Sequence, residues 1–209
     1  IDVVDDPHWD NIKVLLHCDE MVSENSDAPI DLAPREMWSH ITGSTETFVG
    51  NYWSSSATVD TTIKKYGAGS FAFNGSSSYM WKPTQFQEDD FLENDFTIEA
   101  WVYVTGNGSG SLKNILSTNR TTSGVTHGFS FYAGSGTGTD ALKPGIACMF
   151  TGTSVEITSP DSISLNTWTH IATVRDGNTM RLYVDGVQKA SGICSSTYRY
   201  DNSADYYIG

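Results

Sequence analysis

The sequence contains few basic residues and no long apolar run, and both absences exclude classes of function. Its 209 residues include 12 Lys and Arg against 25 Asp and Glu, for a net charge of −13. Without a basic stripe to neutralise phosphates, we expect no binding to nucleic acid or to anionic lipid. Without a stretch of about 20 apolar residues, we expect no membrane insertion by a helix. The acidity favours solubility, and a calcium-linked role is its second interpretation.

Cysteine is also scarce, with three residues at Cys18, Cys148 and Cys194. An odd number cannot pair completely within one chain, so the sequence does not look like a disulfide-stapled secreted module. Cys18 and Cys148 lie in apolar runs, where a buried free thiol is the more common outcome. A bridge between Cys148 and Cys194 is possible, but no spacing requires it.

Several catalytic motifs are missing as well. The chain has no Gly-x-Ser-x-Gly, no His-Glu-x-x-His and no Glu-x-Asp-x-Glu, the last of which would place paired carboxylates on one face of a strand. Glu99 is the lone acid of its strand, and the acids of residues 89–95 lie in a turn-rich connection. His170 alternates with apolar neighbours, as a packed or partly buried residue would. We therefore expect a protein that is not an enzyme.

What the sequence does contain is a series of short alternating runs separated by Gly, Ser, Asn and Asp. Residues 96–104 are the clearest strand, because every even position in them is apolar. Residues 166–186 indicate a hairpin, with a strand over 168–175, an Asp-Gly turn and a second strand over 179–184. Similar runs elsewhere, without helical periodicity, predict an all-β fold, a two-sheet antiparallel β-sandwich.

The hairpin, with its W-T-H-I-A-T-V-R-D-G and L-Y-V-D-G segments, resembles the C-terminal half of laminin-G-like, concanavalin-A-type jelly rolls. Three further segments match in the expected order: residues 14–19 resemble the opening strand, 67–79 the glycine-aromatic-Asn-Gly segment, and 95–102 the central strand. Residues 207–209 resemble the closing Tyr-Ile-Gly. The resemblance implies a lectin/glucanase-type jelly roll, a fold that binds ligands more often than it transforms them.

The same resemblance sets the predicted domain organisation. Residues 1–11 are polar and acidic and are interpreted as a linker or N-terminal arm, and residues 12–209 as one laminin-G-like domain. The family normally continues past Tyr-Ile-Gly into a last strand, so we expect a fragment of a longer polypeptide in which another segment fills the sheet edge. Residues 6–11 and the Leu-Leu-His run after them further resemble copies of this domain embedded in tailed-phage virion proteins.

Aromatic residues beside polar groups suit sugar stacking, and they recur on the odd positions of the central strand and on the hairpin. The candidate ligand-binding residues are Trp101, Tyr103, Arg181 and Tyr183, with Glu99 and Asp185 beside them. The competing interpretation is that these aromatic side chains belong to the core or are covered by loops.

The resemblance also implies a structural Ca²⁺ held by carboxylate and backbone oxygens. At matching positions its ligands would be Asp19, Asn74 and Gly75. Asn74 stands where the family often has Asp, and the absent last strand commonly supplies a further ligand. The competing interpretation of Asn74-Gly75 is a simple turn.

Together these features predict a non-catalytic recognition module of a larger virion or extracellular protein that binds host-surface glycans. One alternative is a structural decoration domain of a phage capsid or tail, which would contact other virion subunits. Another is a carbohydrate-binding appendage of a polysaccharide-degrading enzyme. In each case we expect a location on the virion surface or outside the cell, within a larger assembly.

Overall fold

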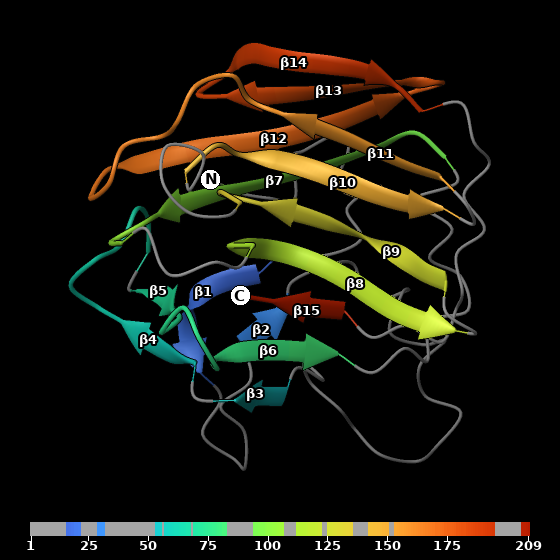
Figure 1. Cartoon of the computed structure of the whole chain (residues 1–209). Coiled ribbons are helices and arrows are strands. Elements are labelled where there is room, and N and C mark those ends of the chain that lie inside the picture. The colour runs from blue at the N-terminus through green and yellow to red at the C-terminus, as the bar shows by residue number, and fades with distance from the viewer. Residues whose placement is uncertain are drawn as a thin grey trace, which may run out of the picture. The chain divides into compact units, whose positions relative to one another are not determined.

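The computed structural model describes residues 16–21, 29–31, 53–55, 57–67, 69–82, 94–106, 112–122, 125–135, 142–150, 153–194 and 206–209. Every regular element in these ranges is a β-strand (Figure 1). None of them contains a helix long and apolar enough to cross a membrane. The chain divides into two compact units, Ile1–Phe86 and Gln87–Gly209. The predicted arm over residues 1–11 lies outside the described residues.

The described residues of the first unit form three short antiparallel strand pairs. These are β1 (Leu16–Met21) with β2 (Pro29–Asp31), β3 (Trp53–Ser55) with β6 (Tyr79–Lys82), and β4 (Thr58–Asp60) with β5 (Ser70–Ala72). β4 ends where the Asp60 carboxylate accepts the backbone N–H groups of Ile63 at 3.0 Å and Thr62 at 2.7 Å. These two hydrogen bonds lower the pKa of Asp60, because they favour its charged form. They also close the turn that leads the chain towards β5.

The second unit is a sandwich of two antiparallel sheets. Its strands are β7 (Phe96–Tyr103), β8 (Asn114–Thr122), β9 (Val125–Tyr132), β10 (Gly145–Phe150), β11 (Thr153–Thr158), β12 (Trp168–Asp176), β13 (Thr179–Val184), β14 (Val187–Ile193) and β15 (Tyr206–Ile208). One sheet has the order β14-β13-β12-β7, and the other has the order β11-β10-β9-β8-β15 within this unit. The predicted all-β antiparallel sandwich is confirmed.

β14 is a strand that the alternation of the sequence does not predict. The register between β14 and β13 shifts between Leu182 and Tyr183. Such a shift interrupts the alternation of inward and outward side chains by which a strand is predicted from sequence. The turn before it does carry a signal, because Asp185 and Gly186 both have positive φ, at 49° and 76°. Two successive positive φ angles are typical of the type I′ turn, which matches the twist of a tight hairpin.

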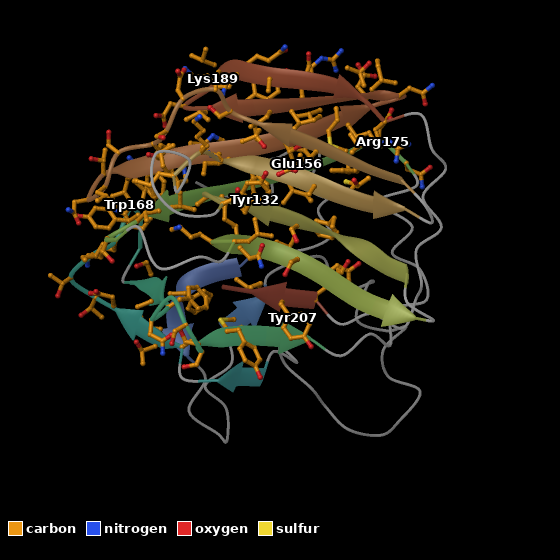
Figure 2. All side chains as sticks on the ribbon, in the orientation of Figure 1. Tyr132, Glu156, Trp168, Arg175, Lys189 and Tyr207 are labelled. Carbon is orange, nitrogen blue, oxygen red and sulfur yellow. The ribbon has the colours of Figure 1, made fainter. Side chains whose placement is uncertain are left out.

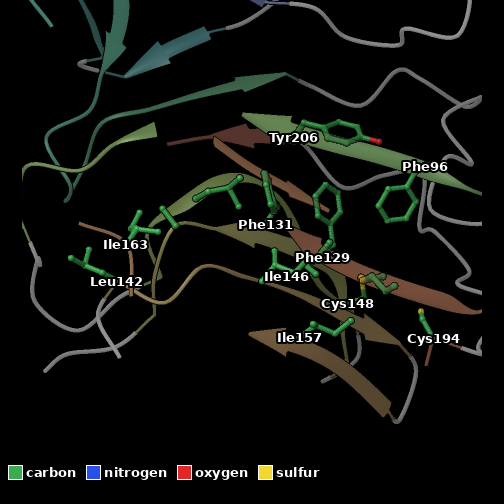
Figure 3. Close-up of a cluster of buried hydrophobic side chains, with 14 residues drawn as sticks. Phe96, Phe129, Phe131, Leu142, Ile146, Cys148, Ile157, Ile163, Cys194 and Tyr206 are labelled. Carbon is green, nitrogen blue, oxygen red and sulfur yellow. The ribbon is translucent and has the colours of Figure 1, made fainter. Parts of the chain in front are cut away.

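The core of the second unit lies between its two sheets (Figure 3). Alternate residues of the larger sheet, among them Phe129 and Phe131 on β9 and Ile146 on β10, are fully buried there. Ile171 and Leu182 meet them from the four-stranded sheet, and neither has any exposed surface. Because successive side chains of a strand point to opposite faces, this packing decides which residues of each strand face outward.

A hydrogen-bonded cluster lies on the other face of the larger sheet, because Tyr132 follows the core residue Phe131 on β9. Figure 2 labels Tyr132 and Glu156 of this cluster. The Tyr132 hydroxyl, which is fully buried, donates to Glu156 Oε1 at 2.6 Å and lies 3.0 Å from Thr158 Oγ1. Burial, and then the bond to Glu156, raises the pKa of Tyr132 far above its ordinary value. The ring needs a residue without a side chain beside it, and Gly145 occupies that position on β10.

We expect Gly145→Ala to lower the free energy of unfolding by about 1–3 kcal/mol, the usual effect of overpacking. An added Cβ would collide with the Tyr132 ring tip and would lie 2.8 Å from the Ile157 carbonyl oxygen. Chemical unfolding followed by tryptophan fluorescence would measure the change. Gly106→Ala is the matched control, because a Cβ there meets nothing within 4 Å. Equal midpoints for the two variants would contradict this packing.

Cys148 and Cys194 are free, buried thiols of the core (Figure 3). Burial raises the pKa of Cys148 to about 12, and it also raises the pKa of Cys194. The bridge that the sequence left open is therefore not formed between these two residues in this structure. The side chain of Cys18 lies outside the described part of the chain.

We expect iodoacetamide at pH 8 to alkylate Cys148 and Cys194 at least about a hundredfold more slowly in the folded chain than in denaturant, because the thiolate is the reactive form. Peptide mass spectrometry would follow each cysteine separately. Equal rates in the folded and unfolded chain would show that these thiols are not in the core. A peptide pair that stays linked in denaturant until reduction would show a disulfide instead.

Candidate functional site

The outer face of the four-stranded sheet displays the odd positions of β7. Because the even positions of this strand pack against the core, its alternation directs Glu99, Trp101 and Tyr103 outward. Trp101 keeps 38% of its surface exposed, and Tyr103 is partly exposed. Trp101 is thus a surface residue of the sheet and does not belong to the core.

The neighbouring strand β12 contributes two more ring side chains to this face. The register of the pair sets His170 opposite Trp101 and Trp168 opposite Tyr103. The Trp101 and His170 ring centroids are 5.2 Å apart with planes tilted by 48°, and those of Tyr103 and Trp168 are 5.4 Å apart with a tilt of 56°. Such offset, tilted pairs are the favoured geometry of neighbouring aromatic rings. Two cross-strand pairs therefore form one continuous surface.

Tyr183 on β13 belongs to the same face. It lies opposite Ala172 of β12, and Ala172 in turn lies opposite Glu99 of β7. Ala172, which lies between these two residues, is 6% exposed. We call the surface formed by Trp101, Tyr103, Trp168, His170 and Tyr183 the aromatic face.

Arg181, the fourth residue predicted for ligand binding, lies at the edge of this surface. It lies opposite Val174 of β12. On β13 it is the next outward-facing residue from Tyr183, about 7 Å away along the strand. Its Nη1 atom lies 3.2 Å from Asp176 Oδ2, and its side chain is 30% exposed. Its charge is therefore compensated by an acid of the same hairpin.

Two acids border the aromatic face, and each contacts His170. Glu99 Oε2 lies 3.5 Å from His170 Nε2, and the Glu99 side chain is 62% exposed. Asp185 Oδ1 accepts the backbone N–H of His170 at 2.9 Å, and the Asp185 N–H donates to the His170 carbonyl at 2.8 Å. Asp185 thus holds the end of the hairpin, and Glu99 presents its carboxylate to solvent beside the rings.

The sequence does not single out Trp168 and His170 as site residues. The alternation within the hairpin shows that they share a side of one strand, but it does not show which strand lies next to it. Only the pairing of β12 with β7 places these rings beside Trp101 and Tyr103. The grouping of these rings therefore depends on contacts between distant segments. The residue pattern of a single segment does not reveal it.

A laminin-G-type family model, that of the concanavalin A-like lectin/glucanases superfamily, matches residues 73–209. The match covers more than half of the chain and all of the strands of the second unit. The chain belongs to this superfamily. The family resemblance found in the sequence is confirmed at that level, and embedding in a tailed-phage protein stays a prediction. No curated protein sequence matches the chain.

Two solved structures share the fold of this chain at low sequence identity. Domain 4 of the GH43 extracellular arabinanase AbnA from Geobacillus stearothermophilus is 16% identical, with a TM-score of 0.56 over 75% of this chain and 68% of that one. The binding domain of botulinum neurotoxin serotype C1 is 10% identical, with a TM-score of 0.58 over 96% of this chain and 43% of that one. At these identities the similarity extends to the fold alone.

The predicted calcium ligands Asn74 and Gly75 form a tight polar turn. Asn74 Oδ1 accepts the backbone N–H groups of Ser76 at 2.9 Å, Ser77 at 2.9 Å and Ser78 at 3.0 Å. Gly75 has a φ of 70°, which glycine adopts readily. Three amide protons pointing at one oxygen repel a cation, so Asn74 does not fit a calcium ligand in this conformation. The turn interpretation accounts for both residues.

The third predicted ligand, Asp19, lies on β1, and its side chain is outside the described part of the chain. Among the described residues, no group of three or more His, Cys, Asp or Glu could hold a metal ion. A structural calcium at this position stays a prediction, and the hydrogen bonds to Asn74 favour the turn interpretation for that residue.

We expect Asn74→Ala to lower the free energy of unfolding by about 1 kcal/mol, because three amide donors lose their acceptor at an exposed turn. Urea unfolding with and without added CaCl₂ would measure the loss. Ser76→Ala is the control, because only the backbone N–H of this residue bonds to Asn74. A loss that grows when calcium is present would show that Asn74 is a metal ligand after all.

Proposed function

We propose that this domain is a non-catalytic module that binds glycans through the aromatic face. The observation that carries the proposal is the set of two tilted ring pairs, Trp101–His170 and Tyr103–Trp168, on an exposed sheet surface. Trp and Tyr offer an apolar body together with a polar tip, so they stack on the apolar faces of sugar rings and reach their hydroxyl groups. Glu99 lies beside the rings and accepts hydrogen bonds from such hydroxyls.

Catalysis does not form part of the proposal. Glycoside hydrolysis normally uses two carboxyl groups that flank the scissile bond, separated by about 5–9.5 Å. Near the rings, Glu99 is paired with an imidazole, and the Asp185 carboxylate is bonded to a backbone N–H. Each of these carboxylates thus contacts His170, and we assign neither of them a catalytic role.

Membership of the lectin/glucanase superfamily and the fold shared with the arabinanase domain, which is described in complex with arabinotriose, are compatible with a saccharide ligand. That arabinanase is extracellular, and we propose a location outside the cell or on a virion surface for this chain too. The net charge of −13 suits a soluble surface domain of a larger assembly. An alternative form of this proposal has as the parent a polysaccharide-degrading enzyme that carries the module as an appendage.

A second candidate function is protein–protein decoration of a larger particle, in which other virion subunits are the partners. It is favoured by β14, the end strand of the four-stranded sheet, where Val187 is 59% and Ile193 is 66% exposed. Exposed apolar residues on a terminal strand suit contact with another chain. In that case the aromatic face would bind no sugar.

We expect Trp101→Ala to weaken binding of an oligosaccharide by at least about tenfold, because this ring is a large contact on the exposed face. The variant should remain folded at the temperature of the assay, which a thermal melt checks. A glycan array identifies the ligand, and titration calorimetry then measures the affinities of the two proteins. Val187→Ala, on the same sheet, is the control for loss of exposed apolar surface. An array without any hit at high protein concentration would contradict glycan binding and favour the decoration function.

A further inference from the structure

The four strands that carry the aromatic face contain three lysine or arginine side chains, and each of them is already engaged. Arg175 is 7% exposed on the inner side, and its Nε donates to the Gly177 carbonyl at 3.1 Å. Arg181 is paired with Asp176, and Lys189 Nζ lies 3.0 Å from Asp161 Oδ2. These strands are described in full. Arg175 is buried on the inner side, and Arg181 and Lys189 each lie beside an acid, so the outer face of the sheet has no lysine or arginine without an acidic partner.

Negative charge is, in contrast, accessible at the rings. Glu99 exposes 62% of its side chain and has His170 as its ionisable neighbour, at 3.5 Å. Asp185 is exposed at the turn that ends β13. The chain as a whole carries a net charge of −13, which adds a repulsive field for anions.

A sugar stacked on Trp101 would lie close to Glu99. The two residues occupy successive outward positions of β7, about 7 Å apart, which is less than the Debye length of about 8–10 Å at physiological salt. A sugar carboxylate or sulfate would be repelled there, and the guanidinium of Arg181, at the edge of the face, is already paired with Asp176. A sugar hydroxyl would instead donate a hydrogen bond to Glu99.

We propose that the aromatic face selects neutral glycans and that Glu99 is the residue that rejects sugars bearing carboxylate or sulfate groups. This inference rests on the proposed function, because it concerns the ligand class of the same surface. It adds a specificity that neither the fold nor the exposed rings imply, since rings alone stack equally well on charged and uncharged sugars. Selectivity then results from a repulsive group placed beside an attractive one.

The test compares four proteins on one array that holds neutral glycans together with their sialylated, uronate-containing and sulfated counterparts. The proteins are the unaltered chain, Glu99→Gln, Glu156→Gln and Trp101→Ala. Glu156→Gln is the control, because it changes the net charge by the same amount on β11 of the other sheet. The glutamine side-chain oxygen can still accept the hydrogen bond from the Tyr132 hydroxyl. Titration calorimetry at low and high salt then measures each neutral hit and its acidic counterpart.

We expect every hit of the unaltered chain to be neutral. Glu99→Gln should strengthen binding of the acidic counterparts by roughly tenfold at low salt, with a smaller gain at high salt, and Glu156→Gln should not. Acidic hits that Trp101→Ala abolishes would overturn this inference and leave the proposed function intact. Neutral hits without any gain for Glu99→Gln would overturn the role of Glu99. An array with no hit for any protein would overturn the proposed function, and the inference with it.

Discussion

The register between β7 and β12 is the constraint on which both the core and the aromatic face depend. Because side chains alternate between the two sides of a strand, a slip by one residue would turn Trp101 towards the core and Ile98 towards solvent. Burial of apolar residues from both strands opposes such a slip. The same register then sets Trp101 beside His170, so the exposed ring pairs are a consequence of how the interior packs.

The third strand of the surface is fixed by short turns. Gly177, with a φ of 56°, begins the turn between β12 and β13, and positive φ at this first position is typical of a type II′ turn. At the other end of β13, Asp185 exchanges two hydrogen bonds with His170. Both ends of the hairpin are thus closed by local interactions, and Tyr183 has little freedom to move away from the rings. A preorganised surface loses less entropy when a ligand binds.

The sequence predicted those parts of the structure whose signal is local. The apolar even positions of residues 96–104 and the Asp-Gly turn of the hairpin were sufficient to place β7, β12 and β13. Trp101 and Tyr183 followed from the same alternation, whereas Trp168 became a site residue only through pairing across strands. At Asn74 the pattern was ambiguous, because the same residue type suits a calcium site and a turn. The three backbone N–H groups that donate to its side-chain oxygen favour the turn.

The acidity of the chain and its aromatic face have a common physical explanation. An exposed group of rings favours association between copies of a protein, and a large net charge of one sign opposes it. With a net charge of −13, like-charge repulsion between copies allows the rings to stay exposed. Positive charge at the aromatic face would also repel the same face of another copy. It would, however, attract the acidic surfaces elsewhere on that copy. A negatively charged surface with accessible rings is therefore best matched to an uncharged ligand. The exposed carboxylate of Glu99 repels other copies of the chain and also repels acidic ligands.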